Sequence, residues 1–330
     1  MQSFAAATLD DAESFALEHA STPQMRDLLT RAFAGLRIQA SQYGLVSFVD
    51  LPVLLHTALT GDEHAAHPLA LATTLIALGA GALDDVADGE PRPEWRDAPA
   101  NQMELAAVAS LSVLPLLALR RIPVTPQRAI AMHDALYTGL LTMIEGQLAD
   151  LASAGSSPDP DAVVASIVGK SGGELALFTR LAALLAGMDH DIVEHCAAMG
   201  RAMGVAAQIG ADCIDIFQSE HSDDLTNGTR TLPIALHLHT LGGEDRKRFL
   251  RLLGAAQQDR QAQVAARDAM VAAGCVRQCA LLTRVWMEKA HRHLSAVARF
   301  DPPAQVLRDW IELSAFERGK APAGTVPGRG

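Results

Sequence analysis

The stretch PLALATTLIALGAGALDDVADGE, from Pro68 to Glu90, is a long apolar segment that ends in a cluster of aspartates. Asp84 and Asp88 are four residues apart, so on a helix they project from one face, with Asp85 on the flank. Carboxylates at this spacing repel one another by about 0.2–0.5 kcal/mol, and at a helix C-terminus they also meet the negative end of the helix dipole. A bound cation would remove both penalties, and such oxygen ligands suit Mg2+. Gly89, Pro91 and Pro93 follow the aspartates and end the helix. The alternative to a metal site is therefore a solvated acidic turn.

A second cluster of aspartates follows another apolar segment, in QIGADCIDIFQSEHSDDLTNGTRTLP, from Gln208 to Pro233. It contains Asp212, Asp215, Asp223 and Asp224. If both segments are helices, their ends could face each other across one cavity and hold divalent cations between them. Such a site would bind a diphosphate, and the apolar segments above it would hold a long hydrocarbon.

Composition limits the class of protein. The chain has 330 residues, of which 49% are hydrophobic, enough for a sizeable core. Its net charge of −11 argues against a nucleic-acid binder. The N-terminus has no basic segment typical of a secretory signal. The longest uncharged run, from Ala66 to Leu83, contains His67 and Pro68 and is marginal for a span of about 20 apolar residues. We therefore expect a buried helix in a cytoplasmic protein without an integral membrane span.

The rest of the chain is predicted to be helical nearly throughout. Alanine and leucine dominate, and glycine and proline gather in short clusters between about ten helical segments. The sequence favours an all-α, single-domain helical bundle around a central apolar cavity. We expect this domain to cover residues 1–318 and a disordered tail to cover residues 319–330.

Five motifs resemble those of the trans-polyprenyl diphosphate synthase family, which has the class I isoprenoid synthase fold. LDDVADGE is similar to the first aspartate-rich motif of that family. The stretch MIEGQLADL (Met143–Leu151) resembles its GQ-x-x-D-L helix, and GKSGGEL (Gly169–Leu175) resembles its K-T-G-x-L helix. The segment beginning at Gln208 resembles its Q-x-x-D-D-x-x-D motif, and SDDLTNGTRTLP (Ser222–Pro233) resembles its D-L-x-x-G-K-x-T-L-P loop.

The resemblance implies a prenyl diphosphate substrate, three Mg2+ ions bound with the diphosphate, and a homodimer. It implies four catalytic residues: Asp84, Asp88, Asp212 and Asp215. The implied metal ligands are Asp84, Asp85, Asp88, Asp212, Asp215, Ser219 and Asp223. The implied diphosphate-binding residues are Lys170, Gln208, Arg230 and Arg92. The implied cavity residues are Gly79, Ala80, Gln147 and Phe178.

In the resembled family, bulky aromatic residues at the positions of Gly79 and Ala80 shorten the pocket. Both residues are small here, so a substrate of fifteen or more carbons could fit. Close packing between helices would also explain small residues at these positions.

Other positions depart from the pattern of the chain-elongating members. Those members carry a G-K-x-x-R-P segment before the first aspartates. In this chain the corresponding stretch is GLRIQA (Gly35–Ala40) or, in another alignment, VSFVDLPVLLH (Val46–His56), and neither contains both the lysine and the arginine. The histidine usual above the first aspartates is missing, and Ala211 stands where the second motif has its leading aspartate. Because a diphosphate needs several cationic contacts, a second diphosphate site is predicted to be poorly built.

The second cluster also resembles the metal triad of class I terpene cyclases. Asp215, Ser219 and Asp223 recur at i, i+4 and i+8, which on a continuous helix is one face. This interpretation requires the helix to continue to residue 223. Otherwise Ser219 and Asp223 begin a polar loop, and metal binding at this wall depends on Asp212 and Asp215.

Three functions remain open from the sequence. The favoured one is a terpene synthase-like enzyme that ionises one prenyl diphosphate and cyclises or quenches it; Trp95, Tyr137, Phe178 and Phe217 are available for cation–π contacts. The second is prenyl transfer, either chain elongation with basic residues placed elsewhere, such as Arg37, or transfer to an acceptor that is not an isoprenoid. The third is a catalytically weak relative that binds a prenyl diphosphate or a partner subunit, which Ala211 would favour.

Overall fold

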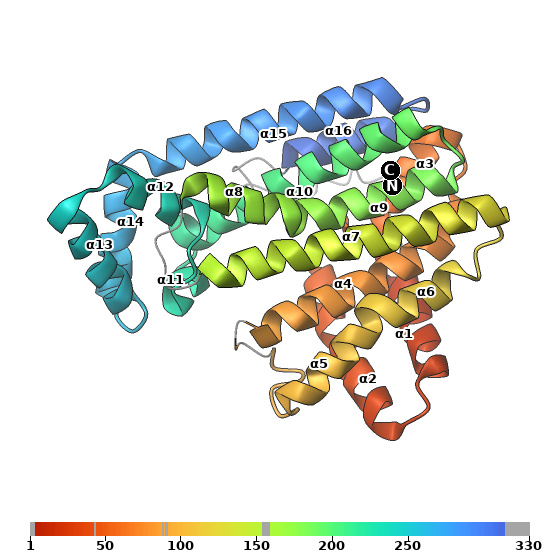
Figure 1. Cartoon of the computed structure of the whole chain (residues 1–330), viewed down its shortest axis with the longest axis horizontal. Coiled ribbons are helices and arrows are strands. Elements are labelled where there is room, and N and C mark those ends of the chain that lie inside the picture. The colour runs from red at the N-terminus through yellow and green to blue at the C-terminus, as the bar shows by residue number, and fades with distance from the viewer. Residues whose placement is uncertain (1–3, 43, 88, 90–91, 154–158, 314–330) are drawn as a thin grey trace, which may run out of the picture.

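The computed structural model describes residues 4–42, 44–87, 89, 92–153 and 159–313. All regular structure in this part of the chain is helical, with no strand (Figure 1), which confirms the predicted all-α fold. The N-terminal half consists of α1 (Ala5–His19), α2 (Pro23–Ser41), α3 (Asp50–Thr60), η1 (His64–Ala66), α4 (His67–Ala87), α5 (Ala100–Val108), η2 (Ala109–Val113), α6 (Leu114–Leu119) and α7 (Pro126–Ser153). The C-terminal half consists of α8 (Pro160–Gly169), α9 (Ser171–Leu185), α10 (His190–Gln218), α11 (Asp223–Asn227), α12 (Leu232–Thr240), α13 (Gly243–Ala256), α14 (Arg260–Ala272), α15 (Cys275–Val297) and α16 (Pro303–Leu313).

The longest helices lie side by side (Figure 1). α15 packs on α10, α10 on α9, and α9 on α7. α4 faces α7 and α9 across a cavity, and its outer side is covered by α1, α2, α5 and α6. The two apolar segments that end in aspartates are therefore long helices of one bundle, as the sequence predicts.

Glycines in two of the sequence motifs allow the helices to approach closely. A Cβ on Gly146 of α7 would lie 2.3 Å from the backbone nitrogen of Lys170, and one on Gly169 would lie 2.8 Å from the Cα of Gly146. Likewise, a Cβ on Gly204 of α10 would lie 2.2 Å from the carbonyl oxygen of Ser171. Since no side chain fits at these crossings, glycine there brings the start of α9 against both α7 and α10.

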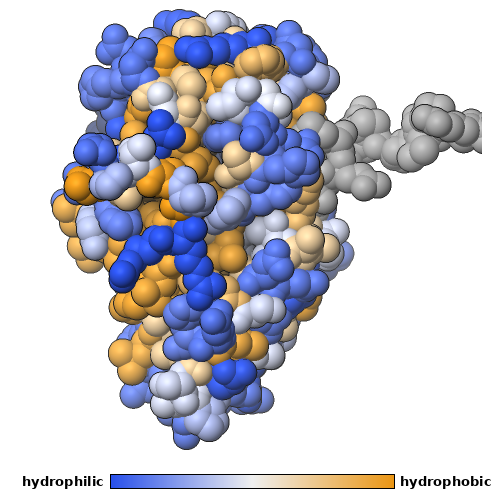
Figure 2. All heavy atoms as spheres, turned by 90° about the vertical axis from the view of Figure 1, so that its right-hand side faces the viewer, coloured by the Kyte–Doolittle hydropathy of each residue, from blue (hydrophilic) through white to orange (hydrophobic). Residues whose placement is uncertain are grey.

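Three helical stretches of the described chain are long and apolar enough to cross a membrane, judged by length and composition: His64–Ala87, Ala100–Leu119 and Pro160–Leu185. In the fold they pack against other helices, and half or more of the most apolar part of each is buried. Hydrophobic side chains also reach the surface, as patches among hydrophilic ones on the face shown in Figure 2. The absence of an integral membrane span stays a prediction.

α13 and α14 form a small lobe beside the main bundle (Figure 1) with its own hydrophobic cluster, which includes Phe249, Leu253 and Met270. The cluster reaches the end of α10 through Ile216. The tail predicted for residues 319–330 and its boundary at 318 lie outside the described residues.

Candidate active site

A cavity of about 520 Å³ opens between α4, α7 and α9. Near the C-terminal end of α4 its wall is polar, and includes Asp84, Gln147 and Lys170. One and two turns earlier, α4 contributes Ala80 and Ala77. The other apolar lining residues are Leu36, Phe48, Leu83, Ala87, Leu111, Met143, Ile144, Leu148 and Leu151. The cavity thus combines a charged mouth with apolar walls, and its volume is within the range of ligand sites.

Asp84 is the point where three of the sequence motifs meet. Lys170 Nζ lies 2.6 Å from Asp84 Oδ1, and Gln147 Nε2 donates a hydrogen bond of 2.9 Å to the same oxygen. Lys170 Nζ also lies 3.5 Å from Oδ2 of Asp150 on α7. These residues come from α4, α7 and the junction of α8 and α9, so the Gly146–Gly169 contact is what places Gln147 and Lys170 around Asp84.

Asp85 lies beside Arg92, whose Nε is 2.7 Å from Asp85 Oδ2. The guanidinium carbon of Arg92 is 5.5 Å from the ring centroid of Trp95. Arg92, predicted to bind the diphosphate, lines the cavity. Asp88, predicted as a catalytic residue and metal ligand, lies outside the described residues.

The second aspartate cluster is joined to the first through Ser171. Ser171 Oγ donates a hydrogen bond of 2.8 Å to Gln208 Oε1, and Gln208 Nε2 donates one of 2.8 Å to Asp212 Oδ1. Lys170 and Ser171 are neighbours in the chain, so one short segment contacts Asp84 on one side and the Gln208–Asp212 pair on the other. Gln208, predicted to bind the diphosphate, lines the cavity, whereas Asp212 is buried and does not line it.

The predicted triad of Asp215, Ser219 and Asp223 is not formed, because α10 ends at Gln218 and the backbone of Ser219 is extended. Instead, Asp215 caps the N-terminus of α11. Its carboxylate accepts hydrogen bonds from Ser222 Oγ at 2.5 Å and from the backbone N–H groups of Asp223 and Asp224, both at 3.1 Å. The helix therefore ends before Ser219, and Asp223 begins the short helix α11. The proposed ligands on this wall are then Asp212 and Asp215.

Burial and mutual repulsion raise the pKa of three carboxyl groups in this region. Burial raises the pKa of Asp212 to about 7, against the hydrogen bond from Gln208, which lowers it. Burial and the charges of Asp212 and Asp215 raise the pKa of Asp224 to about 9. Burial and the charge of Asp84 raise the pKa of Glu174 to about 7. Crowded carboxylates of this kind are stabilised by a cation.

The chemistry of these ligands fits Mg2+. All candidate ligands are carboxylate oxygens, on α4 and near the end of α10, which Mg2+ prefers to nitrogen and sulfur. Within the described ranges, no three acidic, histidine or cysteine residues lie close enough together to hold a metal ion by themselves. Mg2+ is usually bound by one or two carboxylates, with substrate phosphates and water completing its coordination.

Two of the predicted cavity residues do not line the cavity. Gly79 faces α5 and η2, where a Cβ would lie 2.4 Å from the backbone nitrogen of Leu111 and 2.6 Å from the carbonyl oxygen of Ala107. Close helix packing therefore explains Gly79. Phe178 is fully buried in the hydrophobic core. Ala80 and Gln147 do line the cavity.

The aromatic residues expected near a carbocation lie elsewhere as well. Trp95 is 1% exposed and packed in the core, Tyr137 is 56% exposed on α7, and Phe217 packs between two smaller hydrophobic clusters. Arg230 donates a hydrogen bond of 3.0 Å to the carbonyl oxygen of Gly228 and does not line the cavity. Among the described residues of the wall, the aromatic side chain is that of Phe48, from the segment before α3.

Sequence reasoning missed three residues of the site: Phe48, Asp150 and Glu174. Glu174 carries a carboxyl group in the first turn of α9, a helix whose buried residues are mostly apolar. A lone acidic residue within GKSGGELALF was a signal that could have identified it. Phe48 could not be recognised, because nothing in the sequence shows which side of its segment faces the cavity.

The fold is shared with solved prenyl synthases. A geranylgeranyl pyrophosphate synthetase from Pyrococcus horikoshii Ot3 superposes with a TM-score of 0.81 at 21% identity, covering 95% of this chain and 96% of that one. A polyprenyl synthetase from Streptomyces coelicolor A3(2) superposes with a TM-score of 0.78 at 19% identity, covering 94% of this chain and 99% of that one. A decaprenyl diphosphate synthase from Rhodobacter capsulatus superposes with a TM-score of 0.78 at 18% identity, covering 95% of this chain and 96% of that one.

The sequence comparisons identify the family. A search of curated proteins finds no match. The family model described as polyprenyl synthetase matches residues 51–270, which contain the motifs around Asp84, Gln147, Lys170 and Gln208. The match covers more than half of the chain, and the fold agrees with it. The chain therefore belongs to the polyprenyl synthetase family and is an enzyme of the class I isoprenoid synthase type.

Proposed function

We propose that this enzyme ionises one allylic prenyl diphosphate with the help of Mg2+ and then cyclises or quenches the resulting cation, as a terpene synthase does. The observation that carries this proposal is the distribution of charge around the cavity. Its described wall contains two cations, Lys170 and Arg92, and both lie near the first aspartate motif, beside Asp84 and Asp85. One diphosphate can be held there, and the apolar wall would hold its hydrocarbon chain.

The residues around Asp84 would have distinct tasks in the reaction. When bound, Mg2+ would supply Lewis-acid stabilisation of the departing diphosphate, and Asp84, Asp85, Asp212 and Asp215 would hold it. Lys170 would contribute an ammonium group to the leaving diphosphate, and Gln147 would orient Asp84 through its hydrogen bond. The wall around Ala80 would exclude water, which protects an allylic cation from premature capture.

Prenyl transfer to an acceptor is the second candidate. It is favoured by a smaller cavity of about 300 Å³ beside the first, which could hold a second substrate. Its described lining contains no lysine, arginine or histidine, so it offers no cation to a second diphosphate. Chain elongation with isopentenyl diphosphate is therefore less well supported than transfer to an uncharged acceptor.

We also propose that the enzyme acts as a homodimer. α7 carries a stripe of exposed apolar side chains at spacings of three, four and seven residues: Ile130, Tyr137, Leu141, Ile144 and Leu148. Helix α5 and segment η2 also expose apolar side chains, those of Leu105, Val108 and Val113. Exposed apolar side chains in such number are typical of an interface between subunits.

The proposed function is tested by incubating the full chain with Mg2+ and geranyl, farnesyl or geranylgeranyl diphosphate. We expect diphosphate release together with a hydrocarbon or alcohol, from at least one substrate and without isopentenyl diphosphate. Omitting Mg2+ should abolish the release. A longer prenyl diphosphate that forms only with isopentenyl diphosphate would instead establish chain elongation, and no release from any substrate would favour the catalytically weak relative.

A further inference from the structure

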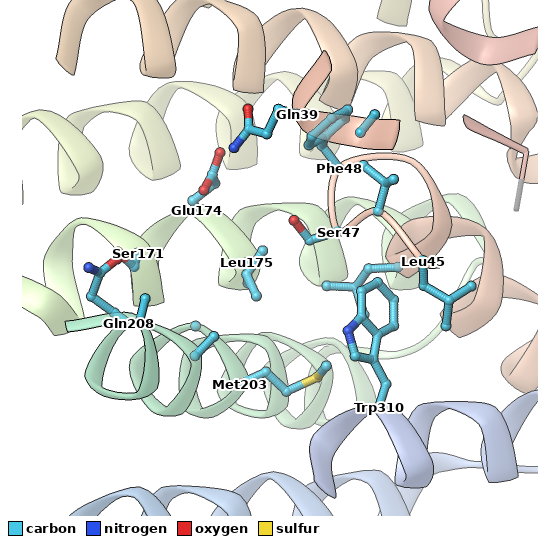
Figure 3. A pocket seen from close by; sticks show the side chains of 16 residues that line it. Gln39, Leu45, Ser47, Phe48, Ser171, Glu174, Leu175, Met203, Gln208 and Trp310 are labelled. Carbon is cyan, nitrogen blue, oxygen red and sulfur yellow. Dashed lines mark hydrogen bonds between the residues drawn. The ribbon is translucent and has the colours of Figure 1, made fainter. Parts of the chain in front are cut away.

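The smaller cavity adjoins the larger one. Both are lined by Gln39, Ser47, Phe48, Ser171, Glu174 and Gln208. Figure 3 shows the smaller cavity, with Glu174 and Gln39 on one side and Trp310 of α16 on the other. A molecule in the smaller cavity would therefore lie next to the prenyl chain in the larger one, with this shared wall between them.

The smaller cavity selects against anions. Among its described lining residues, Glu174 is the one ionisable group. The other polar groups are neutral amides and hydroxyls, from Gln39, Ser47, Ser171 and Gln208, and much of the remaining wall is apolar, including Leu51, Met203 and Trp310. A diphosphate or carboxylate would meet a carboxylate there and no cation, which is unfavourable in a partly desolvated site. An uncharged molecule with an apolar body and a hydroxyl group matches this lining.

Glu174 lies where the two cavities meet and has no assigned structural task. Within the described part of the chain, its carboxylate makes no hydrogen bond and no ion pair, although Lys170 and Asp84 act on it through space. A desolvated carboxylate without a partner is costly unless it has a function. In Figure 3 its side chain points toward the amide of Gln39 rather than toward a helix end.

We propose that the smaller cavity binds an uncharged alcohol or phenol, and that Glu174 accepts its proton when the hydroxyl oxygen captures the prenyl cation. The bond between the allylic carbon and the diphosphate oxygen breaks, and its electron pair leaves with the diphosphate. A lone pair of the hydroxyl oxygen forms the new C–O bond. The O–H bond breaks, its electron pair stays on oxygen, and the proton passes to the carboxylate of Glu174. The product is a prenyl ether. This inference rests on the proposed ionisation and specifies the molecule that quenches the cation.

The test uses the full chain with farnesyl diphosphate, Mg2+ and benzyl alcohol as the probe, with 4-(hydroxymethyl)benzoate as an anionic probe that carries the same hydroxymethyl group. Diphosphate release and the farnesyl ether are measured in the same reactions, with enzyme-free controls. We expect saturable ether formation from benzyl alcohol and at least about tenfold less from the anionic probe. Equal capture of both probes would overturn the proposed selectivity.

Three variants separate the role of Glu174 from ionisation. Glu174→Gln should lower the ratio of ether to released diphosphate by about 100-fold or more, the usual size of a general-base contribution. Because Glu174 also lines the larger cavity, the measured quantity is this ratio within one reaction and not the rate of release. Ala207→Phe, which narrows the smaller cavity alone, should lower the same ratio. Glu145→Gln, the same substitution at an exposed site on α7, should leave this ratio unchanged.

The two proposals fail in different ways. Diphosphate release without ether, or an unchanged ratio in Glu174→Gln, would overturn only the acceptor site. No diphosphate release from any allylic substrate would overturn the proposed function and the acceptor site with it.

Discussion

At the scale of single residues, Asp84 connects the parts of the site. Its Oδ1 accepts a hydrogen bond from Gln147 and pairs with Lys170, so its charge holds α4, α7 and the start of α9 together. The same carboxylate is a proposed metal ligand. A substitution there should therefore affect activity far more than stability, since an amide can keep one of the hydrogen bonds but binds Mg2+ poorly.

We expect Asp84→Asn to lower diphosphate release by about 100-fold or more, because metal binding and the orientation of the site both depend on this carboxylate. The matched control is Asp134→Asn, an exposed aspartate on α7, which should behave as wild type. Steady-state diphosphate release, with circular dichroism to check folding, measures the effect. Wild-type turnover in Asp84→Asn would show that Asp84 is not a metal ligand required for the reaction.

The raised pKa of Asp224 should make the stability of the protein depend on pH. Its pKa is raised from an ordinary 3.8 to about 9, so between these values the folded protein holds a proton that the unfolded chain has lost. Stability from this group is thus present at low pH and is lost as the pH rises toward 9. In Mg2+-free buffer, we expect Tm to fall between pH 6 and pH 9.

Two variants isolate this contribution. Asp224→Asn, which is neutral at every pH, should flatten the fall of Tm above pH 7, while the smaller fall below pH 7 from Asp212 and Glu174 remains. Asp223→Asn, at the exposed neighbouring position, should keep the full slope and wild-type activity, because Asp223 is not part of a helical triad. An unchanged slope in Asp224→Asn would contradict the assignment.

At the scale of helices, glycine positions decide which side chains meet. Gly146→Ala would place a methyl group 2.3 Å from the backbone nitrogen of Lys170, so α7 and the α8–α9 junction must move apart. We expect a loss of about 1–3 kcal/mol in the free energy of unfolding, typical of overpacking. Gly254→Ala, with nothing within 4 Å of the new methyl group on α13, should instead stabilise by about 0.5–1 kcal/mol. Urea unfolding of both variants is the measurement, and equal effects would contradict the close contact.

The helices and their boundaries also show how far the sequence could predict this protein. The apolar segments before Asp84 and Asp212 and the order of the motifs predicted the all-α bundle and assigned Asp84, Gln147 and Lys170 to one site. The end of α10 could not be predicted from the sequence. The spacing of Asp215, Ser219 and Asp223 is compatible with a helix that continues to residue 223. The cap that Asp215 provides for α11 depends on how the chain folds back, which the spacing does not show. Gly79 was misassigned for a similar reason: a small residue fits either a cavity or a helix crossing.

At the scale of the whole molecule, the apolar stripe on α7 predicts a dimer. Leu141→Glu should convert a dimeric enzyme to monomers, because it would bury a charge in the interface. Leu281→Glu, at a similarly exposed leucine on α15, should leave the dimer intact. Sedimentation velocity at micromolar concentration distinguishes the two, and a monomeric wild-type chain would contradict the proposed interface.

The proposed enzyme ionises one allylic diphosphate and needs no second one. We would test this by measuring diphosphate release and products by mass spectrometry from geranyl, farnesyl and geranylgeranyl diphosphates with Mg2+, each with and without isopentenyl diphosphate. We expect release and a hydrocarbon, alcohol or ether product that do not depend on isopentenyl diphosphate. Turnover that occurs only with isopentenyl diphosphate, and yields a longer prenyl diphosphate, would rule out the proposed function.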